Sequence, residues 1–203
     1  MSRRLLDYGP SALLLECEDL PEALGLLPLL RGEPNIDEVI PGARTVLLRL
    51  NAHVDDAQRR RLLTMPAMAL HETESAPIRI EVDYGGEDLA EVAKQITSTP
   101  AEVIRLHASQ IWTVGFCGFS PGFAYLQPEH DWLHVRRRPV PRTRVPAGAV
   151  GLADSWSGIY PREGPGGWQL IGRTEARLWD VRRPSPALLQ PGDRVQFVAI
   201  NES

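Results

Sequence analysis

The sequence predicts an α+β protein, with a small α/β domain over residues 1–77 followed by a β-rich domain over residues 78–203. Three observations lead to this prediction. Apolar runs of strand length alternate with helix-periodic stretches in the first part of the chain. A polar segment that ends in proline, residues 71–77, has the composition of a linker. From residue 111 onward, glycine and proline separate short apolar runs, which is typical of closed or sandwiched β structure.

The first domain is predicted to contain a strand, a helix, two further strands and a second helix. The first helix is rich in leucine and carries Pro21 near its first turn, where proline is tolerated. The turn Pro41-Gly42 separates the two later strands, because proline presets φ and glycine accepts a positive φ. In chain order, these elements are expected at residues 11–17, 20–31, 36–40, 45–50 and 54–63.

The second domain is predicted to begin with a half-buried strand at residues 78–82, where apolar and polar residues alternate. Two helical stretches follow at residues 88–97 and 100–107. Beyond them the chain has few helix-periodic windows, so we expect the remainder to form mainly strands and turns.

Composition and charge indicate an ordinary globular protein. The 203 residues are 43% hydrophobic and 24% charged, with a formal net charge of −4, so no overall positive field attracts nucleic acid or anionic lipid. There is no run of 18 apolar residues and no leader-like start, and we therefore expect a cytoplasmic protein without a membrane partner. The five histidines share no metal-ligand spacing, which predicts no metal site on this chain.

Two glycine-rich segments are candidates for binding. Gly85-Gly86 lies between a strand and a helix, where backbone N–H groups can hold an anion, although for the pair taken alone we favour a tight turn. The segment Gly118-Phe-Ser-Pro-Gly122 formally matches the Gly-x-Ser-x-Gly pattern of serine hydrolases. Pro121 removes the N–H that would serve the oxyanion hole, so we reject Ser120 as a nucleophile.

Two arginine-bearing segments are further candidates. Arg142 and Arg144 are two residues apart and point to one side of an extended strand, where guanidinium groups suit carboxylate or phosphate. For residues 136–138 we favour a solvated hairpin tip. Residues 164–167 are expected to form a flexible glycine loop. A following strand would present polar groups that can fix a small substrate, namely Gln169 and Arg173, together with the nearby Tyr160.

These segments, in this order, resemble the 5-oxoprolinase B-subunit family, also called allophanate hydrolase subunit 1, which includes the kinase A inhibitor of sporulating bacteria. The resemblance covers most of residues 78–203 and, more loosely, the part before it. The matching stretches are Tyr84-Gly-Gly-Glu, Glu102-Val-Ile-Arg-Leu-His107, Gly118-Phe-Ser-Pro-Gly-Phe, Pro141-Arg-Thr-Arg-Val-Pro-Ala-Gly148, Gly158-Ile-Tyr-Pro and Pro165-Gly-Gly-Trp-Gln-Leu-Ile-Gly-Arg-Thr174.

The resemblance implies that the second domain is a cyclophilin-like β-barrel and that the pair of domains is of the carboxyltransferase type. It implies one component of a heteromeric hydrolase that uses ATP to open 5-oxoproline to glutamate. The implied partners are proteins like the C-type and A-type subunits of 5-oxoprolinase. ATP, with Mg²⁺, is expected in the assembled complex. The sequence has no biotin-attachment motif, so any biotin would arrive on another polypeptide.

Within that expectation, residue chemistry suggests particular roles. Arg142, Arg144 and Arg173 are expected to hold the substrate carboxylate or phosphate charge. Gly85 and Gly86, with Gly166 and Gly167 of the glycine loop, are expected to cradle an anion, and Gln169 to bind substrate. His107 and Tyr160, with Arg173, are expected to transfer or orient protons.

Departures from the family pattern leave the substrate open. Ala124 stands where the family carries proline, and residues 153–158 replace a glycine-rich run. Two alternatives remain, a non-catalytic inhibitor of a sensor histidine kinase and a component of urea or allophanate metabolism. A prolyl isomerase is disfavoured, because the fold alone does not carry that activity.

Overall fold

The computed structural model describes residues 3–69 and 76–200, and the chain divides into two compact units, residues 1–75 and 76–203. The boundary expected from sequence, between residues 77 and 78, lies two positions further along the chain. Most of the expected linker, residues 71–75, lies outside the described residues. No helix in the described part of the chain is long and apolar enough to cross a membrane.

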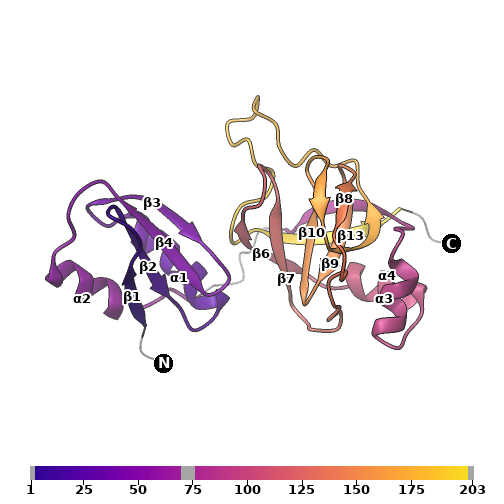
Figure 1. The fold of residues 1–203 in the computed structure, drawn as a ribbon, viewed down its shortest axis with the longest axis horizontal. Helices are drawn as coiled ribbons and strands as arrows, with labels where there is room; N and C mark the ends of the chain where they lie inside the picture. The colour runs from indigo at the N-terminus through magenta and orange to yellow at the C-terminus, as the bar shows by residue number, and fades with distance from the viewer. Residues whose placement is uncertain (1–2, 70–75, 201–203) are drawn as a thin grey trace. The chain divides into compact units, whose positions relative to one another are not determined.

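The first unit is an antiparallel four-stranded sheet with two helices, in the strand order β1-β2-β4-β3 (Figure 1). Helix α1 packs against β3, and α2 packs against β1. The side chain of Asp19 caps the first turn of α1 by accepting a hydrogen bond from the Glu22 N–H. The elements are β1 (Arg4–Asp7), β2 (Ala12–Glu16), α1 (Leu20–Arg31), β3 (Ile36–Pro41), β4 (Thr45–Leu50) and α2 (Asp56–Thr64).

Strand β1 was not expected from the sequence. It has only two apolar residues, Leu5 and Leu6, between charged neighbours, and it pairs with β2 as the edge of the sheet. A short edge strand with charged ends leaves little alternation in the sequence, so it becomes a strand mainly because β2 offers free backbone groups.

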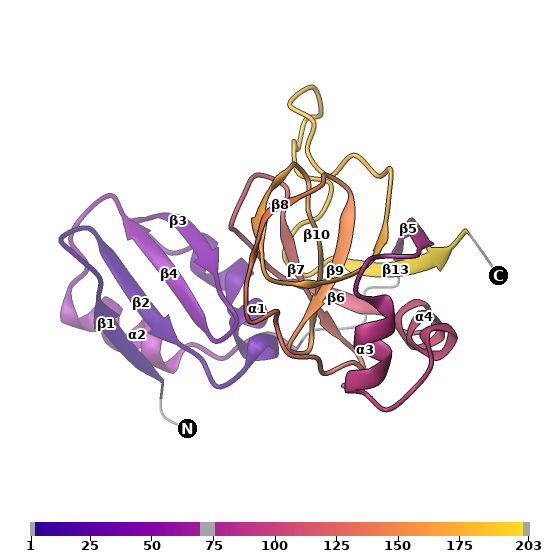
Figure 2. The ribbon, with the colours of Figure 1, turned by 45° about the vertical axis from the view of Figure 1, so that its right-hand side comes forward.

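The second unit is a closed barrel in the order β10-β7-β6-β13-β5-β12-β9, with the small sheet β11-β8 beside it (Figure 2). This confirms the expected α+β class with a β-barrel. The pair β13 and β5 is parallel, whereas the other neighbours in the barrel are antiparallel. Its strands are β5 (Ile78–Tyr84), β6 (Trp112–Cys117), β7 (Ala124–Pro128), β8 (Arg142–Val145), β9 (Ala149–Ala153), β10 (Trp156–Ile159), β11 (Gly164–Gly166), β12 (Gln169–Arg173) and β13 (Arg194–Ala199).

Two helices, α3 (Leu89–Gln95) and α4 (Pro100–Ala108), follow β5 and pack on each other. Helix α3 contacts β12 and α4 contacts β13, and both views show the two helices together on one side of the barrel (Figures 1 and 2). The barrel interior is apolar, with Trp112, Val114 and Phe197 almost completely buried. A second cluster, built on Phe123, Tyr160 and Trp168, is mainly aromatic.

Candidate functional site

The glycine pair after β5 forms a tight turn into α3. The N–H groups of Gly85 and Gly86 both donate to the carbonyl oxygen of Ile171, at 3.3 and 3.1 Å. A Cβ atom at position 86 would overlap the Leu170 carbonyl and lie 2.5 Å from the Ile171 carbonyl carbon, so the close approach to β12 requires glycine. The structure gives no support to the anion cradle expected here, because β12 already accepts these N–H groups.

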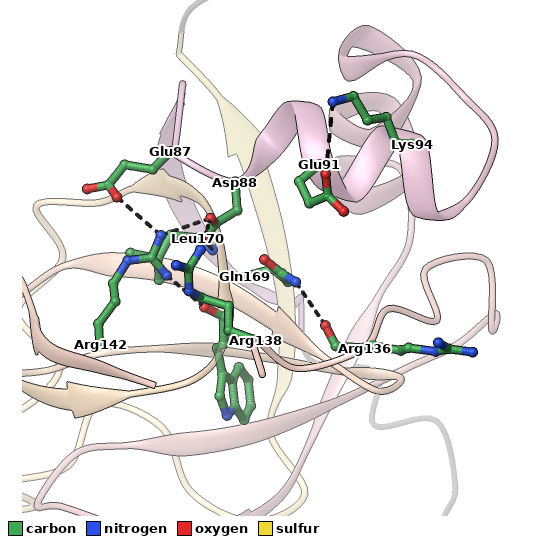
Figure 3. A network of polar contacts seen from close by, with 10 residues as sticks. Glu87, Asp88, Glu91, Lys94, Arg136, Arg138, Arg142, Gln169 and Leu170 are labelled. Carbon is green, nitrogen blue, oxygen red and sulfur yellow. Dashed lines mark hydrogen bonds and ion pairs between the residues drawn. The ribbon is translucent and has the colours of Figure 1, made fainter. Parts of the chain in front are cut away.

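Directly before α3, Asp88 is the centre of a polar network (Figure 3). Its side chain is 6% exposed, and its Oδ2 accepts a hydrogen bond of 2.7 Å from the Leu170 N–H. Its Oδ1 accepts bonds of 2.8 Å from Nη2 of Arg142 and from Nη1 of Arg138. Burial works to raise the pKa of Asp88, but the bonds from Arg142 and Leu170 and the two nearby cations outweigh it and lower that pKa.

The guanidinium group of Arg142 takes part in this network. Its side chain is 14% exposed, and besides Asp88 it reaches Glu87 at 3.1 Å and the Trp168 carbonyl at 3.4 Å. The structure therefore uses the guanidinium group to join the turn after β5 to β8 and β12. Asp88 was not among the site residues expected from sequence, and the signal that could have indicated it is an acidic residue at the entry to a helix.

Arg144 and Arg173 have a different environment from Arg142. Arg144 is 77% exposed and pairs with Glu163 at 2.6 Å, and Arg173 is 62% exposed and pairs with Glu175 at 2.8 Å. Exposed pairs of this kind contribute little to stability, so both guanidinium groups remain able to contact a ligand. Arg173 also lines a depression of about 190 Å³ beside Gly85 and Gly86.

The glycine-rich segment at residues 164–167 is not the flexible loop that the sequence predicted. Gly164–Gly166 forms β11, in which Gly166 pairs with Arg142 of β8. A Cβ atom on Gly166 would overlap the hydroxyl of Tyr160, and the Gly167 carbonyl accepts a 2.8 Å bond from the Arg138 N–H. Gly166 therefore allows close packing against Tyr160, and the anion cradle expected at this segment stays a prediction.

Tyr160 and His107 are both buried. Tyr160 is 2% exposed, and burial raises the pKa of its hydroxyl. His107 is fully buried, with Nδ1 2.7 Å from the Tyr84 hydroxyl and Nε2 2.9 Å from the Ser157 hydroxyl. Its ring stacks on Phe197 at 4.3 Å, and burial lowers the pKa of His107 to about 3.

The expected role of His107 in proton transfer does not fit this position, because a side chain with no exposed surface cannot touch a substrate. The neutral imidazole instead joins β5, β10 and β13 inside the barrel. The sequence placed His107 in a shared motif, and a motif position cannot show whether its side chain points to solvent or to the core.

Gln169 differs from the other expected site residues, because its amide is only partly satisfied. The side chain is 4% exposed, and Nε2 donates a 3.0 Å bond to the carbonyl oxygen of Arg136 (Figure 3). Gln169 lies at the wall of a groove of about 870 Å³ that residues 136–138 also line. The structure thus brings Gln169 next to residues 136–138, for which the sequence favours a solvated hairpin tip.

The aromatic segment around Ser120 forms a packed cluster. Phe116 stacks on Tyr125 at 4.3 Å, and Phe123 lies 5.5 Å from Trp168. Phe119 is 60% exposed with a φ of 67°, a conformation that costs a non-glycine residue about 1 kcal/mol or more.

Of the donors expected to hold phosphate charge, Gly85, Gly86 and Arg142 have partners within the fold, whereas Arg144 and Arg173 are exposed. Among the described residues, no three His, Cys, Asp or Glu side chains are placed to hold a metal ion.

Comparison with known proteins gives the family. Residues 4–189 match the model of the carboxyltransferase domain, subdomain C and D. The chain is 44% identical over 176 residues to the 5-oxoprolinase B-subunit of Escherichia coli O157:H7, a match that covers 83% of this chain and 80% of that protein. It is 41% identical over 175 residues to the 5-oxoprolinase B-subunit of Haemophilus influenzae, covering 83% and 82% of the two chains.

The fold is also similar to that of a solved structure. The crystal structure of TTHA0988 has a TM-score of 0.78 and 33% identity, over 95% of this chain and 41% of TTHA0988. This chain therefore spans about two fifths of the length of that protein. Taken together, the fold, the motif positions and the identities show that the chain belongs to the carboxyltransferase-domain family, with the proteins named as the B-type subunits of 5-oxoprolinase.

Proposed function

We propose that this chain is one component of a 5-oxoprolinase complex, which converts 5-oxoproline, ATP and water to glutamate, ADP and phosphate. The observation that carries the proposal is the identity of 41 to 44% to proteins named as 5-oxoprolinase B-subunits, over more than four fifths of this chain. Proteins like the C-type and A-type subunits of 5-oxoprolinase are its proposed partners, in the cytoplasm.

The ATP-dependent opening of the lactam requires groups from more than this chain. The lactam is a poor electrophile, and water must add to its carbonyl carbon while the C–N bond breaks and the nitrogen leaves as an amine. ATP supplies the driving force, but three of the donors expected to hold its phosphates, Gly85, Gly86 and Arg142, are used by the fold. We therefore propose that this chain contributes substrate contacts, through exposed groups such as Arg144 and Arg173, and that ATP is held by the assembled complex.

The test is glutamate release from 5-oxoproline, measured with the chain alone and after assembly with its C-type and A-type partners. We expect ATP-dependent release only from the full mixture. Omission of ATP and omission of this chain are the two controls.

If a verified assembly releases no glutamate, the proposal fails. The alternatives are then a different amide substrate or inhibition of a sensor histidine kinase, which an autophosphorylation assay with added protein would detect.

A further inference from the structure

The chain between β12 and β13 forms a projecting segment, which we call the arm and define as residues 177–189. Both views show this part of the chain, drawn in gold, extending beyond the strands of the barrel (Figures 1 and 2). Leu178 and Leu189 are buried in the barrel core, and the Leu188 N–H donates to the Leu178 carbonyl at 2.9 Å. The arm is therefore attached to the barrel at both ends by buried residues.

Hydrogen bonds within the arm hold its outer part in one conformation. Asp180 is at their centre, and its carboxylate accepts bonds of 3.1 Å from the Arg182 N–H, 3.0 Å from Arg182 Nε and 3.1 Å from Arg177 Nη1. The Asp180 N–H donates to the Pro186 carbonyl at 2.9 Å, and the Asp180 carbonyl accepts from the Arg183 N–H at 3.1 Å. A segment that is already ordered loses less conformational entropy when it binds a partner, which favours affinity.

The arm turns its acidic residue inward and its apolar residues outward. The Asp180 side chain is 14% exposed, whereas Trp179 is 41% exposed and Val181 is 76% exposed. Arg177 and Arg182, which are close to them in the chain, are also exposed. Tryptophan and arginine are enriched among the residues that dominate binding at protein interfaces. Exposed apolar residues that gather in one place mark a site of interaction.

Another exposed aromatic residue lies beside the arm, on the turn at residues 118–122. Gly122 of this turn packs against the base of the arm, since a Cβ atom on Gly122 would be 3.0 Å from Trp179 Cβ. Phe119 of the same turn is 60% exposed, and its φ of 67° is costly for a residue other than glycine. Backbone strain of this kind is concentrated at sites that contact ligands or partners. We call Phe119, Trp179 and Val181 the apolar patch.

The charges of the arm indicate which kind of molecule fits the apolar patch. Residues 177–189 contain three arginines and one aspartate, although the whole chain has a formal net charge of −4. A two-fold contact between two copies would place one positive arm against another, which is unfavourable. An anionic membrane surface would repel the negative remainder of the chain. A different protein, with carboxylates around an apolar pocket, complements both the charge of the arm and the apolar patch.

A longer relative gives an independent reason to expect a protein in this role. The match to TTHA0988 covers 95% of this chain but 41% of TTHA0988, so more than half of that protein lies outside the match. In TTHA0988, the counterpart of these two domains is therefore joined to a further length of polypeptide. A companion that is not on the same chain has to be held by non-covalent contacts, and a preformed arm with exposed apolar and arginine side chains can supply them.

We propose that the arm and Phe119 form a docking surface for a second protein of a different kind, whose contact face has an apolar pocket bordered by carboxylates. Trp179 and Val181 enter the pocket, and Phe119 packs at its edge. Arg177 and Arg182 face the carboxylates. The protein used to test this is the C-type subunit of 5-oxoprolinase. That choice rests on the proposed function, whereas the chemistry of the docking surface rests on the arm itself.

The first test measures the affinity of the intact chain for the purified C-type subunit by calorimetric titration. Val181→Ser removes an apolar side chain that is 76% exposed, and it is expected to weaken binding by about tenfold or more. Val140→Ser is the matched control, because Val140 is 72% exposed in the same unit but lies outside the arm. The affinity of this control variant is expected to equal that of the unchanged protein.

The second test separates docking from stability at Phe119. Phe119→Gly removes the ring, and glycine suits the φ of 67° at this position. The midpoint of thermal unfolding is therefore expected to be equal to or above that of the unchanged protein. The affinity for the C-type subunit is nevertheless expected to fall by about tenfold. A purely structural role of Phe119 would give the opposite result, a lower midpoint with unchanged affinity.

The third test examines the arginines through binding kinetics, measured by surface plasmon resonance with the C-type subunit. Arg182→Gln is expected to slow association by about threefold or more and to leave dissociation nearly unchanged, because a charge at the rim of an interface acts mainly on the encounter. Arg79→Gln is the control, since Arg79 is an exposed arginine on β5, outside the arm. Its association rate is expected to equal that of the unchanged protein.

Three results with the C-type subunit overturn the proposal. They are no binding by the unchanged protein, unchanged affinity in both Val181→Ser and Phe119→Gly, and a loss in Val140→Ser as large as that in Val181→Ser. Two further results assign the apolar patch to another occupant and also overturn it. One is a dimer of the unchanged protein that Val181→Ser dissociates in analytical ultracentrifugation. The other is sedimentation with phosphatidylserine vesicles that Val181→Ser abolishes.

The outcomes also separate this proposal from the proposed function. Glutamate release by the assembled complex, with unchanged C-type affinity in Val181→Ser and Phe119→Gly, supports the function and overturns the docking surface. Binding of the C-type subunit that both substitutions weaken, without glutamate release from the full mixture, supports the docking surface and overturns the function.

Discussion

The Asp88 network and the groove lined by residues 136–138 and Gln169 lie next to each other on the barrel, and they differ in how many of their polar groups are hydrogen-bonded within the fold. Asp88 receives bonds from Leu170, Arg142 and Arg138, and its side chain is 6% exposed. In the groove, the guanidinium groups of Arg136 and Arg137 make no hydrogen bond or ion pair within the described structure, and Gln169 Oε1 also lacks a hydrogen-bond partner there. Residues of the same chemical type thus serve the fold in one place and remain available to a ligand in the other.

The largest expected effect on stability comes from disrupting the Asp88 network. Asp88→Ala leaves Arg142 and Arg138 without their buried anion and the Leu170 N–H without an acceptor. We expect it to lower the free energy of unfolding by about 3–5 kcal/mol. All five tryptophans lie between residues 112 and 179, so tryptophan fluorescence during urea unfolding reports on the barrel unit.

Glu87→Ala is the neighbouring control, since the Glu87 side chain is 74% exposed and should contribute less than about 1 kcal/mol. Equal losses in the Asp88 and Glu87 variants would show that the network is not a centre of stability.

Substitution in the glycine pair is expected to give the next largest effect on stability. The two positions test whether these glycines are needed for close packing. Gly86→Ala is expected to lower the free energy of unfolding by about 3 kcal/mol, because the new methyl group meets the backbone of β12. Gly85→Ala meets nothing within 4 Å and should change that free energy by less than about 0.5 kcal/mol. Thermal and urea unfolding of the two variants measure the difference, and a larger effect at Gly85 would refute the packing explanation.

His107 should make the stability of the barrel depend on pH. Burial lowers the pKa of His107 to about 3 from an ordinary value of 6.5, so between these values the unfolded chain binds the extra proton. Stability is therefore complete above about pH 6.5 and falls on acidification, by up to about 1.4 kcal/mol per pH unit. Asp88 loses its contribution only at lower pH, because its pKa is already below 3.8.

Urea unfolding at pH 7, 6 and 5 measures this slope, and His107→Gln should remove it. A slope that persists in the variant would assign the acid sensitivity to other groups.

The smallest expected effect on stability comes from a substitution in the groove. Arg136→Gln should change the free energy of unfolding by less than about 0.5 kcal/mol, because the guanidinium group makes no bond that folding requires. Arg142→Gln, which removes two bonds to buried or half-buried partners, should cost about 2 kcal/mol or more. Thermal unfolding of the pair checks the contrast, and a loss at Arg136 as large as that at Arg142 would mean that the groove is also part of the structural framework.

The sequence by itself determined the class of fold and many of its elements. Helix α1 and strand β4 have the expected limits of residues 20–31 and 45–50, because each has a strong apolar pattern between clear turn signals. The order of the motifs also led to the right family. Local patterning carries this information, since an element buries its own apolar face whatever its distant neighbours are.

Only the tertiary structure decided which polar residues are open to a ligand. Asp88 is 54 residues from Arg142 and 82 from Leu170, and His107 is 50 from Ser157. Whether an N–H, a guanidinium group or an imidazole is free depends on what the fold places opposite it. The same glycines and arginines that suggested a site in the sequence are therefore divided by the barrel into those that hold it together and those that face the groove.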